Sequence, residues 1–131
     1  MAGELILIVE DNEKNRKLAR DVLTFKGYRT VETESAEEGL KVAEEQRPDL
    51  ILMDFHLPGM NGIEALGMLR ANPATASIPV IAVTASAMTE DLARIMKAGF
   101  EGLQTKPISV LEFIAAVETA LARKREGASP A

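Results

Sequence analysis

The sequence contains no cysteine, which excludes a disulfide framework and a thiolate metal site and makes a reducing compartment the natural setting. It also lacks the basic amino-terminal region of a signal peptide, and none of its apolar runs approaches the roughly 18 residues that span a bilayer. We therefore expect a cytoplasmic protein without a membrane segment.

Positive charge is scarce as well. The formal net charge is −5, whereas proteins that bind phosphate backbones carry clustered lysine and arginine. We interpret the one basic run, residues 123–125, as the solvated end of the last helix, where cations suit the helix dipole. The composition thus argues against a nucleic-acid partner.

Five short runs predict β-strands in a chain whose 131 residues suffice for one domain with a single core. Continuous apolar runs are typical of strands that are buried on both faces of a parallel sheet. They occupy residues 5–9, 50–53, 80–83 and, more weakly, 102–105. The run 28–32 is shorter and more polar, so we place it at the sheet edge.

Helical stretches lie between these runs. Gly27 and Gly99 stand where two of the helices should end, as glycine often does. Other helices open with a cap residue that is followed three positions later by glutamate, the signature of a capping box. These pairs are Ser35 with Glu38, Asn61 with Glu64, and Ser109 with Glu112.

Strand and helix thus alternate five times, which predicts an α/β fold with a doubly wound five-stranded parallel sheet and helices on both faces. Five strands favour the order 2-1-3-4-5 of a flavodoxin-like three-layer sandwich. We expect one domain over residues 1–125. Residues 126–131, which include glycine, serine and proline, should form a flexible tail.

Polar side chains end four of the predicted strands, and they are Glu10 with Asp11, Asp54, Thr84 and Lys106. Because parallel strands end at one edge of their sheet, these side chains should surround one crevice. Three close carboxylates repel one another unless a cation joins them. Oxygen ligands suit Mg²⁺, which leaves room for phosphate oxygens. In such a site Asp54 is placed to form an acyl phosphate, with Lys106 and Thr84 binding phosphate oxygens.

The same residues carry a family resemblance. The motifs are Glu10-Asp11, the loop Asp54-x-x-Leu57-Pro58-x-Met60-Asn61-Gly62, Thr84-Ala85 after a strand, and Lys106-Pro107 near the last helix. In this order and spacing they resemble the receiver domain of two-component response regulators, which has a CheY-like fold. The resemblance runs from about Leu5 to Leu121, nearly the whole chain.

The resemblance implies a role for each position. Asp54 would accept a phosphoryl group from a sensor histidine kinase or a histidine phosphotransfer protein, whose phosphohistidine is the donor. Glu10, Asp11 and Asp54 would bind Mg²⁺, helped by the backbone carbonyl of His56. The chain is similar to stand-alone CheY/DivK-like regulators, which have no output domain and catalyse only their own phosphorylation and dephosphorylation. A downstream target protein would bind the face of the fourth helix, residues 89–98, and the strand and helix that follow.

One position departs from the family pattern. Three residues before the lysine the family usually carries tyrosine or phenylalanine, and this sequence has Leu103. Because that ring makes no bond to phosphate in the family, phosphorylation should be retained. The leucine puts in question how a change at Thr84 reaches the target-binding face.

Two alternatives stay open at this stage. A haloacid-dehalogenase-type phosphotransferase also uses a strand-end aspartate and Mg²⁺, but it would carry a second aspartate at the position of His56 and a cap domain. A receiver-like module that no longer takes phosphate would be expected to lack one of the acid pair, Asp54, Thr84 or Lys106, and all are present. The ring of His56 is given no role, because a lone loop histidine is most often simply exposed.

Overall fold

The computed structural model describes residues 3–55, 57, 59–84, 89–105 and 109–128. Strands and helices alternate along the whole chain. They are β1 (Leu5–Val9), α1 (Glu13–Phe25), β2 (Arg29–Thr33), α2 (Ala36–Gln46), β3 (Leu50–Asp54), α3 (Gly62–Ala71), β4 (Val80–Thr84), α4 (Thr89–Ala98), β5 (Gly102–Thr105) and α5 (Val110–Ala128). The five strands match the five predicted runs to within a residue or so at their ends, which confirms the α/β class.

All five strands form one parallel sheet in the order β2-β1-β3-β4-β5. Both the predicted order and the edge position of β2 are therefore confirmed. The register places Val9 of β1 beside Thr33 on one side and Met53 on the other. Asp54, the last residue of β3, lies beside Val83 of β4. The strands thus end at one level, and the residues that follow them meet at one edge of the sheet.

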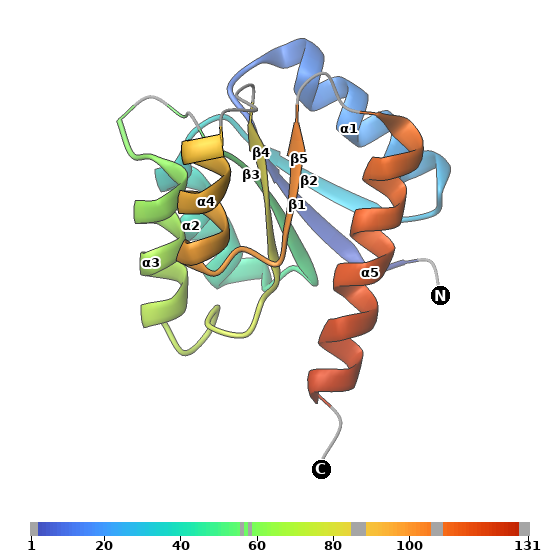
Figure 1. Ribbon diagram of the computed structural model, residues 1–131. Helices are drawn as coiled ribbons and strands as arrows, with labels where there is room; N and C mark the ends of the chain where they lie inside the picture. The colour runs from blue at the N-terminus through green and yellow to red at the C-terminus, as the bar shows by residue number, and fades with distance from the viewer. Residues whose placement is uncertain (1–2, 56, 58, 85–88, 106–108, 129–131) are drawn as a thin grey trace.

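Helices cover both faces of the sheet in a three-layer sandwich (Figure 1). The face under α2, α3 and α4 includes Met53 in its core, and the face under α1 and α5 includes Leu52 and Phe113. Successive residues of a strand point to opposite faces. A strand covered on both faces is therefore apolar along its length, and all five residues of β3 are buried, four of them apolar and the last one Asp54.

Local capping follows the sequence closely. Asn61 and Glu64 form the complete capping box that starts α3, with the Asn61 side chain accepting from the Glu64 N–H at 2.9 Å. Ser35 forms one of the two hydrogen bonds of a capping box, since its hydroxyl oxygen accepts from the Glu38 N–H. The Glu38 carboxylate accepts from the Ser35 hydroxyl. Gly27 and Gly99 follow α1 and α4 with φ of 91° and 103°. These positive φ values confirm the helix ends that the glycines predicted.

The end of α2 could not be read from the residue type. Arg47 is the C-cap of α2 and adopts the left-handed conformation with φ of 46°. Its N–H donates to the carbonyl of Ala43 at 2.9 Å, which satisfies one of the last carbonyl groups of the helix. Left-handed caps are usually glycine or asparagine, so an arginine gives no local signal for this turn.

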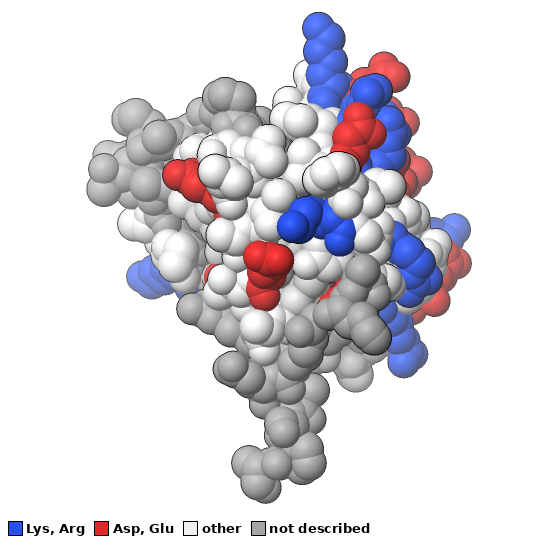
Figure 2. Space-filling view, turned by 90° about the vertical axis from the view of Figure 1, so that its right-hand side faces the viewer, with Lys and Arg blue, Asp and Glu red and all other residues white. Residues whose placement is uncertain are grey.

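The surface carries both signs of charge. Lysine and arginine lie among aspartate and glutamate on the face shown in Figure 2, and they form no broad basic patch there. This mixture agrees with the formal net charge of −5. Among the described residues, no helix is both long and apolar enough to span a bilayer.

Candidate functional site

Asp54 is delivered to the sheet edge by a buried strand. Asp54 is only 3% exposed, and the main chain just beyond it is fixed because the Phe55 N–H donates to the Val83 carbonyl at 2.8 Å. A carboxylate this deeply buried has to be paired, hydrogen-bonded or joined to a metal, because desolvating it alone is costly. Burying a carboxylate at this position therefore lowers the stability of the fold unless the carboxylate has a partner, which indicates a functional role.

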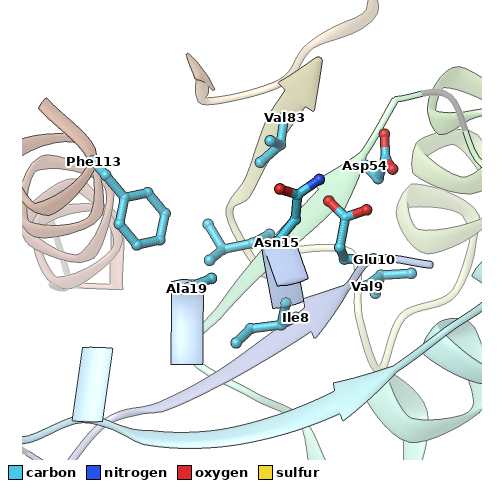
Figure 3. Close-up of a pocket in the computed structure, with 9 residues that line it drawn as sticks. Ile8, Val9, Glu10, Asn15, Ala19, Asp54, Val83 and Phe113 are labelled. Atoms are coloured by element: carbon cyan, nitrogen blue, oxygen red, sulfur yellow. The ribbon is translucent and has the colours of Figure 1, made fainter. Parts of the chain in front are cut away.

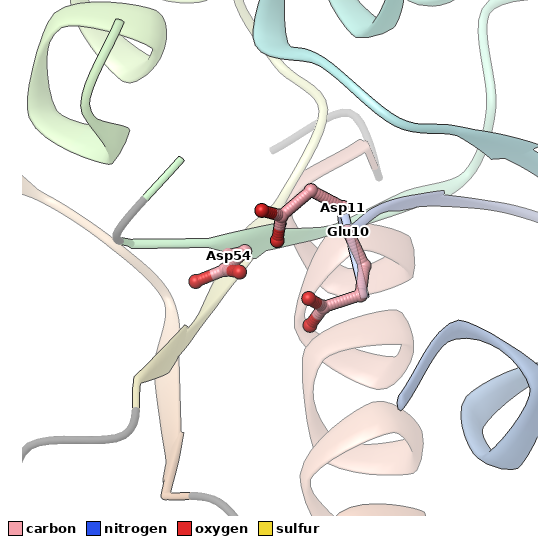
Figure 4. Close-up of side chains that lie close together, drawn as sticks. All are labelled: Glu10, Asp11 and Asp54. Carbon is pink, nitrogen blue, oxygen red and sulfur yellow. The ribbon is translucent and has the colours of Figure 1, made fainter. Parts of the chain in front are cut away.

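Glu10 and Asp11 follow β1 and lie beside Asp54. One carboxylate oxygen from each of the three residues lies within 4.8 Å of the other two. Figure 4 shows the three carboxylate groups gathered at the ends of β1 and β3. Glu10 and Asp54 are buried, whereas Asp11 is exposed. The predicted meeting of these three side chains is thus present in the structure.

The acid pair is held by hydrogen bonds to the end of β2 and to the start of α1. The Glu10 N–H donates to the Thr33 carbonyl at 3.1 Å, which ties the end of β1 to the end of β2. The Asn12 N–H donates to the Glu10 carboxylate at 3.1 Å. Asn12 is in turn the N-cap of α1, whose side chain accepts from the Asn15 N–H at 3.0 Å. The start of α1 therefore depends on the same few residues that place the carboxylates.

The remaining predicted site residues come from β4 and from two short segments. Thr84 ends β4 and is fully buried, and its register partner is Thr105 at the end of β5. Lys106 follows Thr105 in the sequence but lies outside the described residues, as does His56. The position of Thr84 agrees with the predicted crevice, and those of Lys106 and His56 stay predictions.

Below the carboxylates lies a small pocket that the sequence did not indicate. Its lining combines the polar residues Glu10, Asp54 and Asn15 with apolar residues that include Ile8 and Phe113. Figure 3 labels Asn15 and Glu10 among the side chains that line this pocket. Asn15 was missed because it lies in the first turn of α1, where a polar residue reads as an ordinary helix surface position. The only available signal was its place four residues after Asp11.

The donor set suits a hard divalent cation. Three carboxylates converge, one of them exposed and therefore reachable from solvent. Mg²⁺ takes oxygen ligands, commonly one or two carboxylates, and keeps several waters. Carboxylate oxygens gathered this closely repel one another in the absence of a cation. The chemistry of these residues therefore fits Mg²⁺.

Comparison with known proteins decides the family. Residues 6–118 match the model of the response regulator receiver domain. The chain belongs to the receiver-domain family. As a receiver domain of two-component signalling it is a signalling protein rather than an enzyme of metabolism, and its family implies a histidine kinase as upstream partner. Membership also favours the receiver over the dehalogenase-type phosphotransferase that the sequence had left open.

Individual relatives agree with this assignment. The receiver domain is 47% identical over 116 residues to the polar-differentiation response regulator DivK of Brucella anthropi, covering 88% of this chain and 94% of that one. It is also similar to the receiver domain of a sensor histidine kinase from Pseudomonas aeruginosa, with a TM-score of 0.85 and 33% identity over 92% and 99% of the two chains. That structure has a magnesium ion coordinated in its active-site cleft.

A more distant structure supports the fold alone. The chemotaxis response regulator CheY4 of Vibrio cholerae superimposes with a TM-score of 0.84 at 22% identity, over 91% of this chain and 99% of that one. The CheY-like fold that the family resemblance implied is thereby confirmed.

Proposed function

We propose that this receiver domain accepts a phosphoryl group on Asp54 in a Mg²⁺-dependent reaction and that phosphorylation changes its affinity for a downstream protein. The observation that carries the proposal is the convergence of the Glu10, Asp11 and Asp54 carboxylates to within 4.8 Å of one another. Asp54 lies at the centre of the sheet edge, where a donor can approach from beyond the strand ends.

The chemical step is a transfer between two side chains. A carboxylate oxygen of Asp54 attacks the phosphorus of a phosphohistidine on the partner, so that an O–P bond forms. The P–N bond to the partner's histidine breaks, and the ring nitrogen keeps the electron pair. The product is an aspartyl phosphate, a mixed anhydride. A second transfer, to water, returns Asp54 to its carboxylate and releases inorganic phosphate.

The surrounding groups serve the charge that the phosphoryl group brings. Mg²⁺, when bound, neutralises negative charge on phosphoryl and carboxylate oxygens. Glu10, Asp11 and Asp54 would hold it, with the backbone carbonyl of His56 as a further ligand. The hydroxyl of Thr84 would donate a hydrogen bond to one phosphoryl oxygen, and Lys106 would form an ion pair with another.

The wider role follows from the family and the relatives. The donor would be a sensor histidine kinase or a histidine phosphotransfer protein, and the reaction would take place in the cytoplasm. The downstream protein would bind the face formed by α4, β5 and α5. Exposed apolar side chains on α4 and α5 support this face, because Met96 is 59% exposed and Leu111 is 82% exposed. Residues 1–125 would form the receiver domain and residues 126–131 a tail, although the helix α5 continues through the first part of that tail to Ala128.

The test uses a small phosphodonor in place of the kinase. The protein is incubated with acetyl phosphate and Mg²⁺, and its intact mass is measured. We expect one added phosphoryl group, absent after Asp54→Asn and absent with EDTA. Asp49→Asn is the matched control, because Asp49 accepts a hydrogen bond from the Leu5 N–H at the opposite end of β1, away from the carboxylates. No mass gain in a protein that binds Mg²⁺ would instead indicate a receiver-like module that takes no phosphate.

A further inference from the structure

Arg16 connects the acid pair to the neighbouring strand β2. Its Nη1 donates to the main-chain carbonyl of Glu10 at 2.9 Å. Its Nε lies 3.3 Å from the Glu32 carboxylate, and Nη1 lies 3.8 Å from the carboxylate of Glu34. The side chain of Arg16 is 15% exposed, so most of it is packed against these groups. One guanidinium group therefore binds both the main chain of the site and the edge strand.

The carbonyl that Arg16 holds belongs to the peptide group between Glu10 and Asp11. A peptide group is planar, so fixing its carbonyl also fixes the direction in which the chain leaves toward the next residue. The other peptide group of Glu10 is fixed as well, since the Glu10 N–H donates to the Thr33 carbonyl. Both sides of Glu10 are thus anchored to β2, one of them directly and the other through Arg16 and Glu32.

We propose that Arg16 is a positioning residue for the divalent cation. By holding the peptide between Glu10 and Asp11, it sets the direction in which these two carboxylates face Asp54. The inference rests on the proposed function in one respect, namely that the three carboxylates bind Mg²⁺. Arginine suits the task because its planar group donates in several fixed directions at once, whereas a lysine ammonium is a point charge on a flexible stem.

The charge of Arg16 makes the proposal easy to separate from a simple electrostatic effect. A cation next to the carboxylates opposes Mg²⁺ binding, so loss of the charge alone would tighten binding. Loss of a positioning contact weakens it, because carboxylates that can turn away must be ordered again when the ion binds. A purely structural role would lower the stability of the fold and leave the Mg²⁺ affinity of the folded protein unchanged. The three roles thus predict three different outcomes.

Arg20 provides the matched control. It lies one turn further along α1 and binds the same strand, with its Nη1 3.3 and 3.1 Å from the two carboxylate oxygens of Glu32. The hydrogen bond that Arg20 donates to the Glu32 carboxylate raises the pKa of Arg20, so this side chain is also a fixed positive charge. Among the described residues its contacts are with Glu32 and Asp21, and none is with the main chain of Glu10. Replacing it breaks the same link between α1 and β2 without freeing the acid pair.

The experiment is a Mg²⁺ titration by isothermal calorimetry of the full chain and the variants Arg16→Gln, Arg16→Lys and Arg20→Gln. We expect Arg16→Gln to weaken Mg²⁺ binding about tenfold, the lower end of what a group that orients metal ligands usually contributes. Arg16→Lys keeps the charge but loses the planar guanidinium group, so it should weaken Mg²⁺ binding as well. It serves as the second variant if Arg16→Gln does not fold. Arg20→Gln should bind like the parent protein.

A second readout follows phosphorylation by acetyl phosphate. For Arg16→Gln the rate at saturating Mg²⁺ should stay near that of the parent, while the Mg²⁺ concentration for half the maximal rate rises with the dissociation constant. If the parent protein binds Mg²⁺ and both Arg16 variants bind it equally well or more tightly, the positioning role of Arg16 is wrong, and the proposed metal site is kept. A parent protein that does not bind Mg²⁺ at all overturns the proposed metal site and this inference together.

Discussion

Gly62 and Phe55 lie in direct contact across the loop that follows Asp54. The Gly62 N–H donates to the Phe55 carbonyl at 3.1 Å. A Cβ added to Gly62 would lie 3.1 Å from both the Cα and the ring Cδ1 of Phe55. Phe55 is the residue next to Asp54, so the first turn of α3 rests on the main chain beside the proposed phosphoacceptor. A glycine here serves close packing between a helix and the site.

We therefore predict that Gly62→Ala destabilises the protein. The added methyl group meets the main-chain Cα of Phe55 and a buried ring atom of the same residue, and both yield less easily than the end of a flexible side chain. Overpacking of this kind costs about 1–3 kcal/mol. Denaturant unfolding measures the change in the free energy of unfolding.

The control is the same substitution five residues further along α3. A Cβ on Gly67 would have no neighbour within 4 Å, and alanine is favoured over glycine inside a helix by roughly 0.5–1 kcal/mol. Gly67→Ala should accordingly stabilise the protein. Equal effects of the two substitutions would show that the contact with Phe55 carries no weight.

Mg²⁺ should stabilise the fold through the exposed member of the carboxylate cluster. In EDTA, Asp11→Asn should raise the melting temperature slightly, because it removes one of three carboxylates within 4.8 Å. Exposure of Asp11 limits the gain in unfolding free energy to about 0.5–1 kcal/mol. Added Mg²⁺ should raise the melting temperature of the parent protein and have little effect on the variant, since an ion that binds only the folded state stabilises it.

Asp21→Asn makes the same change of charge away from the cluster. Asp21 accepts from Lys17 at 2.8 Å and lies near Arg20, so its removal should lower stability in EDTA. The stabilisation by Mg²⁺ should persist in this variant. If Asp11→Asn melts at a higher temperature than the parent protein both in EDTA and in Mg²⁺, Asp11 does not bind the cation.

Glu101 should be important for stability at the opposite end of the sheet. Its carboxylate oxygen accepts from Arg70 at 2.7 Å and from the Val80 N–H, the first of β4, at 3.0 Å. Hydrogen bonds to charged groups contribute about 1.5–3 kcal/mol, so Glu101→Ala should lower the free energy of unfolding by that amount. Glu101→Gln keeps an acceptor for Val80 and should lose less.

Glu44→Ala is the comparison for Glu101. Glu44 also accepts a side-chain hydrogen bond, from Asn72 at 2.6 Å, but the pair is exposed. Surface substitutions of this kind stay within about 0.5 kcal/mol of the parent protein. Urea unfolding of Glu101→Ala, Glu101→Gln and Glu44→Ala measures the free energy of unfolding of each. Equal losses for Glu101→Ala and Glu44→Ala would contradict the stabilising role of Glu101.

Leu103 offers a test of signal transmission. It is partly buried on β5, where it packs against the core under α4 and has Ala82 as register partner. Leu103→Tyr should leave Mg²⁺ affinity and the rate of phosphorylation nearly unchanged, because the side chain lies outside the carboxylate cluster. It should enlarge the amide chemical-shift changes that acetyl phosphate causes in α4 and β5. Leu103→Ile is the control, and a large loss of phosphorylation in Leu103→Tyr would contradict the separation of these roles.

The site residues differ in how well they could be predicted. Asp54 and Glu10 stand at the ends of apolar runs. Because parallel strands all end at the same edge of their sheet, the proximity of these two residues could be expected from the order of the runs. Arg16, Asn15 and Gly62 belong to helix turns. Their importance depends on which strand or loop lies opposite them, and local sequence does not contain that information.

The same division holds for the fold as a whole. The sequence by itself determined the strands, the order of the sheet and the glycine-ended helices, because buried strands need continuous apolar runs and positive φ favours glycine. Only the tertiary structure decided that α1 reaches across to β2 through Arg16, that Arg47 takes a left-handed cap, and that Gly62 touches the chain beside Asp54. Each of these depends on contacts between segments that are distant in the sequence or on a conformation that its residue type does not favour.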